Sequence, residues 1–160
     1  MPQTAYFDSA LWIAVLVGEP TAGDVGTLIG EIKKENGRIL TSIMTLTEIT
    51  VRAHRESPAK VADAVQLVTS VAAICNVSLE VALMTAQIEA RFMTSVWADT
   101  QGSRRRRWDA LHLATAAAYK ADVVYTFDRR LLHADFSAEP RIPAIRLPQP
   151  QQGSLPYSPP

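Results

Sequence analysis

The stretch Trp108–Asp128, WDALHLATAAAYKADVVYTFD, decides the fold class of this chain. Its alanine-rich first half predicts a helix over 108–119 that begins beside the acidic Asp109. Its second half, Val123–Thr126, is β-branched and aromatic, which favours a strand, and Asp128 follows two residues later. Because ligands of open α/β sheets collect outside the carboxyl ends of the strands, these two acids mark where a functional site is expected.

Outside this stretch, strand patterns and helix patterns alternate along the chain. Further strands are predicted at four places: 4–7, 38–41, 77–81 and 142–147. Pro143 limits the last of these to a sheet edge. Helices are predicted at five places: 10–17, 22–36, 42–55, 58–72 and 82–98. Ser9 is the predicted N-terminal cap of the first helix, and residues 100–107 are predicted to form a loop. The alternation indicates an α/β domain around a small, mainly parallel sheet.

The composition is that of an ordinary globular protein, with 160 residues of which 48% are hydrophobic and 20% charged. The 16 basic and 16 acidic residues give a net charge of zero, which argues against a basic coat but allows a local basic patch. A single cysteine, Cys75, excludes an intramolecular disulfide and a cysteine-rich zinc site. The chain shows neither an export signal nor a membrane-spanning stretch, so we expect a cytoplasmic protein without a membrane partner.

The domain is expected to cover residues 1–147. The segment 148–160 that follows is rich in proline, glutamine, glycine and serine. Such a composition has little apolar surface to bury, so this C-terminal tail is predicted to be disordered.

Two more acidic residues fall where the predicted elements bring them to the same edge of the sheet. Asp8 ends the first strand, and Glu48 lies about two turns into the helix after the second strand. With Asp109 and Asp128 they form a quartet of carboxylates, whose charges would repel one another unless a cation lay between them. Oxygen ligands of this kind select Mg²⁺ or Mn²⁺. The sequence therefore predicts a metal site made of these four acids.

Each acid also has a structural explanation. Asp109 could complement the dipole of its helix, because it lies in the predicted first turn. Glu48 stands three residues after Thr45, a spacing that fits a capping box. Asp8 and Asp128 could be ordinary turn residues at the ends of strands. The argument for a site therefore rests on the four acids together.

The acids lie in four segments that occur in this order: Tyr6–Ala10 (YFDSA), Ser42–Glu48 (SIMTLTE), Asp109–Ala116 (DALHLATA) and Thr126–Leu131 (TFDRRL). These segments resemble the four motifs of PIN-domain nucleases, and most closely those of the VapC-type toxins of bacterial type II toxin–antitoxin modules. The resemblance covers about residues 3–147. It implies a PIN-like three-layer α/β/α fold, in which helices flank a small, mainly parallel central sheet.

The resemblance also implies an activity, which is metal-dependent hydrolysis of RNA phosphodiester bonds by an endoribonuclease toxin. It implies that four acids are catalytic and bind one or two Mg²⁺ or Mn²⁺ ions: Asp8, Glu48, Asp109 and Asp128. Thr126 matches a small hydroxyl residue that supports the site, and Ser9 is a second supporting candidate. His112 lies three residues after Asp109 on the same helical face and could be a proton donor, but the resemblance makes it a structural position of the third motif. The implied partners are an RNA substrate, a cognate antitoxin and a second copy of the chain.

A dense basic run, RRRR, is separated from Asp109 by Trp108 alone and consists of Arg104, Arg105, Arg106 and Arg107. A solvated loop would explain it, but its place beside the acids favours contact with RNA phosphates.

Two other functions of the whole domain are open. A non-catalytic RNA-binding PIN-like module would have no need of four acids in one cleft. An Asp-phosphorylated receiver or phosphatase-like domain would usually carry a second acid near the end of the first strand, where Asp8 is followed by serine and alanine.

Overall fold

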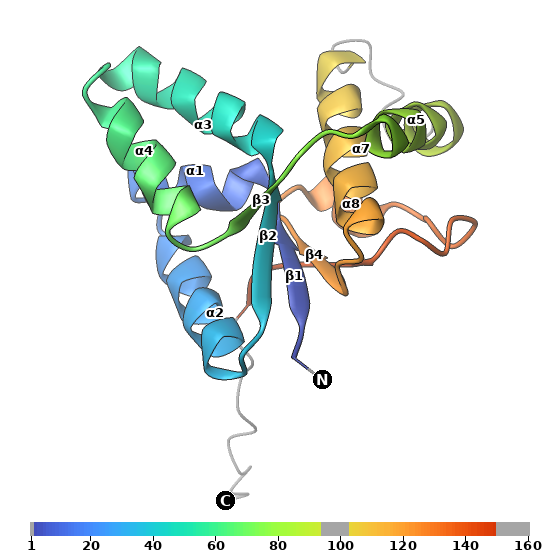
Figure 1. The fold of residues 1–160 in the computed structure, drawn as a ribbon, viewed down its shortest axis with the longest axis horizontal. Coiled ribbons are helices and arrows are strands. Elements are labelled where there is room, and N and C mark those ends of the chain that lie inside the picture. Colours follow the sequence, from blue (N-terminus) through green and yellow to red (C-terminus); the bar gives the residue numbers. More distant parts are fainter. Residues whose placement is uncertain (1, 94–102, 150–160) are drawn as a thin grey trace, which may run out of the picture.

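A five-stranded parallel sheet forms the centre of the computed structural model, which describes residues 2–93 and 103–149, with the backbone alone for 93 and 103–106. The strands are β1 (Thr4–Phe7), β2 (Arg38–Ser42), β3 (Ala73–Cys75), β4 (Val123–Tyr125) and β5 (Ala144–Arg146). Their order is β3-β2-β1-β4-β5, and all four neighbouring pairs are parallel. All carboxyl ends therefore meet at one edge of the sheet, with β1 in the middle (Figure 1).

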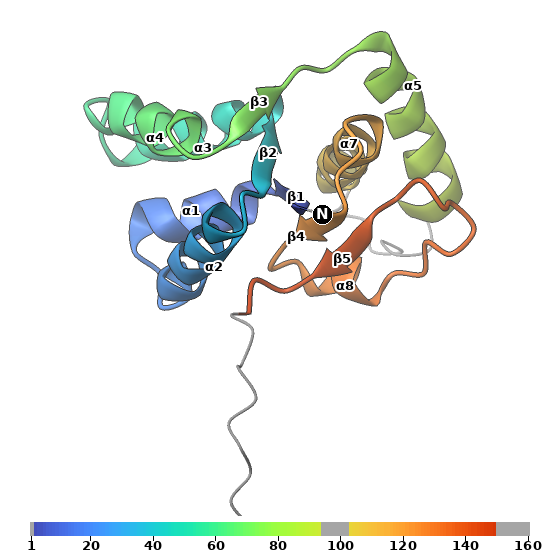
Figure 2. The same cartoon turned by 60° about the horizontal axis from the view of Figure 1, so that its bottom comes forward.

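Helices cover both faces of the sheet, which confirms the three-layer arrangement (Figure 2). One face carries four helices: α1 (Ser9–Val17), α2 (Ala22–Lys34), α3 (Ile43–Glu56) and α4 (Lys60–Thr69). The other face carries α5 (Leu79–Ile88), the π-helical turn η1 (Glu89–Met93) and α7 (Ser103–Ala118). The short helix α8 (Arg129–His133) follows β4 and packs through the buried Leu131 on the side of α7.

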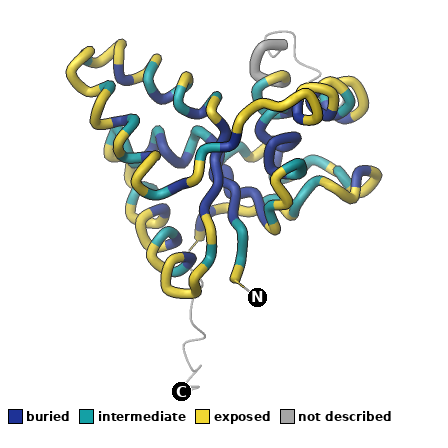
Figure 3. Tube along the Cα trace, viewed as in Figure 1, coloured by how far each residue is buried: buried dark blue, intermediate teal, exposed yellow. Residues whose placement is uncertain are grey.

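The alternation of side chains along β1 divides the hydrophobic core into two halves. Ala5 and Phe7 pack with Trp12 and the other buried residues of α1–α4. Tyr6, between them in the sequence, packs with the buried residues of α5 and α7. The central strands are consequently buried on both sides, as Figure 3 shows. This two-sided burial is the usual condition of a parallel sheet, and it leaves the strand ends as the place where polar groups can gather.

The predicted strand at 77–81 is wrong. The strand of this region is β3, which ends at Cys75, and α5 already begins at Leu79. The hydroxyl of Ser78 accepts a hydrogen bond from the N–H of Val81 at 3.2 Å and so caps α5. The alternation of polar and apolar residues in 77–81 is therefore the start of a helix, with its capping serine and an acidic first turn.

The predicted loop at 100–107 is wrong from residue 103 onward, because α7 begins at Ser103 and contains the basic run. Arginine is a good helix former, and this preference outweighs the polarity of the segment. Asp109 is consequently in the interior of a helix and not in its first turn. The explanation of Asp109 as a partner of the helix dipole therefore fails, since that effect is confined to the terminal turn.

The short helix α8 was not predicted from the sequence. The other predicted elements agree with the structure to within a few residues, and β5 is an edge strand as expected. None of the helices in the described part of the chain is long and apolar enough to cross a membrane. Residues 150–160, most of the predicted tail, lie outside the described residues, and so do Trp97 and the last part of the helix predicted over 82–98.

Candidate active site

Acidic side chains reach the edge of the sheet where β1 and β4 end. Asp8 follows β1 directly, and its N–H donates to the carbonyl of Tyr125, the last residue of β4, at 3.2 Å. Asp128 lies three residues beyond this point at the start of α8. Glu48 comes from α3 on one face of the sheet, and Asp109 comes from α7 on the other. The fold thus directs all four predicted acids to the central strand ends.

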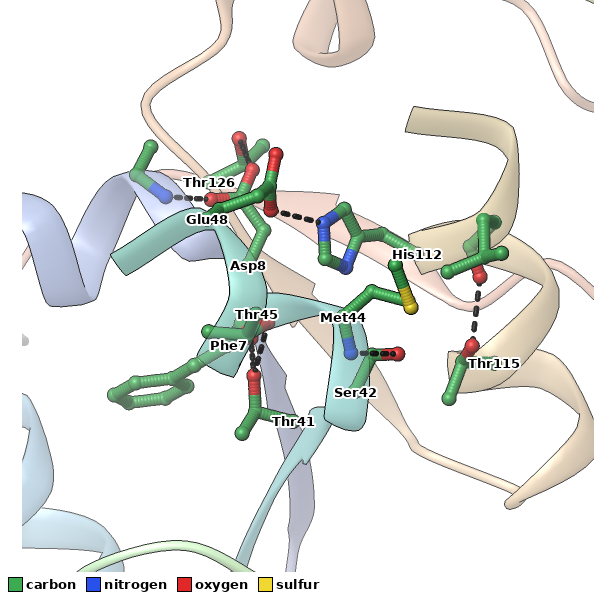
Figure 4. Close-up of polar contacts among 12 residues, drawn as sticks. Phe7, Asp8, Thr41, Ser42, Met44, Thr45, Glu48, His112, Thr115 and Thr126 are labelled. Carbon is green, nitrogen blue, oxygen red and sulfur yellow. Dashed lines mark hydrogen bonds and ion pairs between the residues drawn. The ribbon is translucent and has the colours of Figure 1, made fainter. Parts of the chain in front are cut away.

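Asp8 is 6% exposed and has both carboxylate oxygens engaged (Figure 4). One oxygen accepts from the N–H of Ala10, so that Asp8, and not Ser9 as predicted, caps helix α1. The other accepts from the hydroxyl of Thr126, which in turn accepts from the N–H of Asp128 at 2.9 Å. Thr126 therefore joins the ends of β1 and β4 at the site. Burial raises the pKa of Asp8, although the His112 charge and these hydrogen bonds oppose the rise.

The helix that carries Glu48 is fixed at its first turn. Ser42 caps α3 through its hydroxyl, so the predicted capping box of Thr45 and Glu48 is not formed. The buried hydroxyl of Thr41 donates to the carbonyl of Phe7 at 2.7 Å and lies 2.8 Å from the hydroxyl of Thr45. These contacts tie the start of α3 to the end of β1 and leave the Glu48 carboxylate for another role (Figure 4).

Glu48 is partly exposed, with 27% of its side chain accessible, and its carboxylate contacts His112. The ring Nε2 of His112 lies 3.0 Å from the Glu48 carboxylate, and its Nδ1 lies 2.7 Å from the hydroxyl of the buried Tyr6. Burial acts to raise the pKa of Glu48, but the hydrogen bond and charge of His112 and a hydrogen bond from Ser9 lower it overall. Burial acts to lower the pKa of His112, but Glu48, Asp8 and Asp109 raise it overall.

Asp109 is the acid whose negative charge is least stabilised by contacts within the protein. Its Oδ2 is buried and has no hydrogen-bond partner. Burial, together with the negative charges of Asp128 and Asp8, raises its pKa to about 7. A buried carboxylate oxygen without a partner is unfavourable in a folded protein, which indicates a position built to receive a positively charged ligand.

Asp128 caps α8, since its Oδ1 accepts from the N–H of Arg130 at 2.8 Å. The guanidinium of Arg130 also binds this carboxylate, with N···O distances of 3.2 Å to each oxygen. The charge of Arg130 acts to lower the pKa of Asp109 as well. The site therefore contains a cation of the protein itself, which the sequence analysis did not single out although it follows Asp128 in the fourth motif.

Arg107 is the one residue of the basic run whose side chain the structure describes. It is 73% exposed and forms an ion pair of 3.1 Å with Glu89 of η1. Arg104, Arg105 and Arg106 belong to α7, but their side chains lie outside the described residues. The predicted phosphate contacts of this run therefore stay a prediction.

The acids fit a hard divalent cation by their chemistry. All four offer carboxylate oxygens, and the orphaned oxygen of Asp109 needs a positive partner. Among the described residues, no three His, Cys, Asp or Glu side chains are arranged as a complete metal-binding group. The four predicted acids thus reach one edge of the sheet, but their side chains do not form a complete metal site by themselves.

The fold and the acids at its strand ends define a class of protein. The model of the PIN domain matches residues 5–137, so the chain belongs to the PIN domain family. Comparison with curated protein sequences finds no significant match.

Among solved structures the chain is similar to toxin–antitoxin proteins. It superposes on a chain of VapBC2 from Rickettsia felis, bound to a DNA fragment of its promoter, with a TM-score of 0.67 and 13% identity over 91% of this chain and 98% of that chain. For DNA-bound VapBC from Salmonella typhimurium the TM-score is 0.63, with 16% identity over 91% and 98%. For the sarcin–ricin loop-cleaving toxin VapC20 of Mycobacterium tuberculosis it is 0.58, with 18% identity over 84% and 93%. At these identities the likeness shows the fold.

Proposed function

We propose that the protein is a metal-dependent endoribonuclease and the toxin of a toxin–antitoxin pair. The observation that carries the proposal is the environment of Asp109 at the ends of the central strands. Burial and the charges of Asp128 and Asp8 raise its pKa to about 7, and one of its buried oxygens has no hydrogen-bond partner. Membership of the PIN domain family supports a nuclease. The resemblance in fold to VapC20, described as a toxin that cleaves the sarcin–ricin loop, supports RNA as the substrate.

In this proposal Asp109 would bind Mg²⁺ or Mn²⁺ through its partnerless oxygen, and Asp8 and Asp128 would complete the site directly or through water molecules. A bound divalent cation supplies two things, a lowered pKa for the attacking water and relief of charge on the phosphate oxygens. Asp109 gains the positive partner that it lacks. Glu48, whose pKa is lowered, is ionised at neutral pH and accepts hydrogen bonds from water at its exposed side, which orients the attacking molecule.

The residues around the acids keep this arrangement in place. Thr126 holds Asp8 and the backbone of Asp128, and Ser9 supports Glu48 through its hydroxyl. Arg130 lies on Asp128, where its guanidinium is within reach of a phosphate group that approaches the site. The basic run Arg104–Arg107 supports the same function, since α7 carries it in the two turns before Asp109.

The proposed partners follow from the structural neighbours. Three of the similar structures are VapBC complexes, which supports an antitoxin as the partner of this chain. We further propose that the protein acts as a homodimer in the cytoplasm, where its RNA substrate is found.

Cleavage of total cellular RNA tests the function. Antitoxin-free protein is incubated with Mg²⁺, Mn²⁺ or EDTA, and the wild type is compared with Asp8→Asn. We expect discrete fragments that depend on the metal and disappear in the variant, because Asp8 is at the centre of the acids. His54→Gln serves as a control for a titratable side chain on the exposed surface of α3. Equal cleavage by wild type and Asp8→Asn would contradict the assignment.

The alternatives predict other results. A non-catalytic RNA-binding module would bind RNA in the same gel without cutting it. A receiver-like domain is disfavoured by the fold, because such domains order their strands 2-1-3-4-5, whereas this sheet has the order 3-2-1-4-5.

A further inference from the structure

Behind Glu48 lies a continuous chain of buried hydrogen bonds that the sequence analysis did not foresee. The N–H of Ser42 donates to the hydroxyl of Tyr6 at 3.1 Å. The hydroxyl of Tyr6 lies 2.7 Å from Nδ1 of His112, and Nε2 of His112 lies 3.0 Å from the carboxylate of Glu48. Tyr6 and Ser42 are fully buried and His112 is 3% exposed. The chain thus runs from the interior of the sheet to the candidate site.

The donors and acceptors in this chain fix its direction. The carboxylate of Glu48 can only accept, so Nε2 of His112 carries a proton. The oxygen of Tyr6 already accepts from the backbone of Ser42, so its own proton is free to be donated to Nδ1. When the ring of His112 is neutral, the network therefore favours its Nε2–H tautomer, with each group donating toward Glu48.

We propose that Tyr6 and His112 are positioning residues, which hold the carboxylate of Glu48 at the place where it acts on the metal or on the attacking water. The inference rests on the proposed function, in which Glu48 belongs to the site. It assigns no proton transfer to His112, which contacts Glu48 and not the substrate.

The positions of the three residues in the fold explain why such a device is useful. Tyr6 lies on β1 two residues before Asp8, and His112 lies on α7 three residues after Asp109, on the same face of the helix. Glu48 comes from α3 on the opposite face of the sheet. The network therefore links the three elements that carry three of the acids. A glutamate side chain has several rotatable bonds, and fixing its carboxylate removes the disorder that would otherwise weaken the site.

A simpler explanation is that His112 is a buried polar residue satisfied by its neighbours. The two explanations differ in what the variants change. Loss of a merely structural contact lowers stability and leaves the metal affinity and the chemical step of the folded protein as they were. Loss of a positioning contact acts on metal affinity and kcat and leaves the KM for RNA unchanged.

Three variants of the full chain separate these explanations. Tyr6→Phe removes the hydroxyl at the inner end, and His112→Leu removes both ring nitrogens. His112→Gln keeps a side-chain N–H that can reach the position of Nε2. Two controls remove a comparable group elsewhere. Tyr125→Phe removes a hydroxyl from the neighbouring strand, and Thr115→Val removes a buried hydroxyl that bonds within α7.

Mn²⁺ affinity is measured by electron paramagnetic resonance of the free ion, and kcat and KM are measured on a cleaved RNA. Partners of ligating groups typically change metal affinity or activity by about 10- to 100-fold, so we expect His112→Leu to fall in this range in Mn²⁺ affinity, in kcat, or in both. Tyr6→Phe has a smaller effect in the same direction, and His112→Gln recovers most of the loss. A folded His112→Leu protein with the affinity and kcat of the controls would overturn the proposal. If His112→Leu does not fold, Tyr6→Phe and His112→Gln decide in the same way.

A second measurement does not depend on activity. In the long-range ¹H–¹⁵N spectrum of the metal-free wild type, recorded at a pH where the ring is neutral, His112 is expected as a single Nε2–H tautomer, and Tyr6→Phe is expected to yield a mixture. A proton on Nδ1 alone in the wild type would overturn the proposed direction of the network. If the wild type neither binds Mn²⁺ nor cleaves RNA, the proposed function fails, and the spectrum still decides whether the network exists.

Discussion

Replacing Asp109 with asparagine is expected to stabilise the metal-free protein at alkaline pH while it removes activity. Burial and the charges of Asp128 and Asp8 raise the pKa of Asp109 from 3.8 to about 7. Between these two values the folded protein holds a proton that the unfolded chain has released, so the stability of the wild type falls as the pH rises through this window. Below the window both states are protonated, and the effect is absent.

The magnitude follows from the same two values. At about 1.36 kcal/mol for each pKa unit, the difference between 3.8 and about 7 sets an upper limit of roughly 4 kcal/mol above pH 7. Asp109 is partly exposed, so water screens part of this unfavourable energy. We therefore expect Asp109→Asn to raise the free energy of unfolding at pH 8 by about 2 kcal/mol. Asparagine has the same shape, and its amide can donate to a neighbouring carboxylate in place of the repulsion.

Urea unfolding of both proteins in EDTA at pH 5 and pH 8 measures the effect. The increase in the free energy of unfolding caused by Asp109→Asn should be less than about half as large at pH 5 as at pH 8, because much of the window between pH 3.8 and about pH 7 lies above pH 5. Addition of Mn²⁺ should raise the stability of the wild type more than that of the variant, because a ligand stabilises the state that binds it. If Asp109→Asn is no more stable than the wild type at pH 8, or if its gain does not depend on pH, the reasoning about this carboxylate is refuted.

Two further predictions concern the support of the site and its contact with RNA. Thr126→Val removes the hydroxyl that bridges Asp8 and the backbone of Asp128, and should lower the unfolding free energy by about 1–3 kcal/mol in urea unfolding. Thr126→Ser should restore it, and an unchanged Val variant would contradict the bridging role. Replacing Arg105 and Arg106 with glutamine should reduce the slope of log affinity for single-stranded RNA against log salt by about 1.4, at roughly 0.7 for each phosphate contact. Binding titrations at several salt concentrations measure this slope, and an unchanged slope would exclude the contact.

The fold was largely predictable from the sequence, because hydrophobic periodicity and β-branched runs are local signals. The two strands that carry the site, around Phe7 and Tyr125, both follow from such runs. The errors lie where the local signal is ambiguous. The three residues of β3 are too few to show a pattern, and Ser78–Val81 alternates like a strand although it starts a helix. The polarity of the basic run predicted a loop, but the run lies in helix α7, because arginine is a good helix former.

The candidate site was predictable only in part, because the contacts of its side chains join residues that lie far apart in the sequence. The positions of the four acids follow from topology, since parallel strands end at one edge of the sheet. The partners of these acids depend on contacts between residues far apart in the chain. Tyr6 and His112 are separated by 106 positions and Glu48 and His112 by 64, and no local pattern signals either contact. Arg130 is close to Asp128 in the sequence, but its role depends on the orientation of its side chain over the carboxylate.

The distribution of partners among the acids explains why the site points to a cation. Asp8 has Thr126 and the N–H of Ala10, Glu48 has His112, and Asp128 has Arg130. Each of these acids thus has a partner within the protein, and these contacts hold the geometry of the three carboxylates. Asp109 has a buried oxygen with no partner, although it lies between the charges of Asp128 and Asp8. Under the proposed function, a bound cation would supply the partner that this carboxylate oxygen lacks.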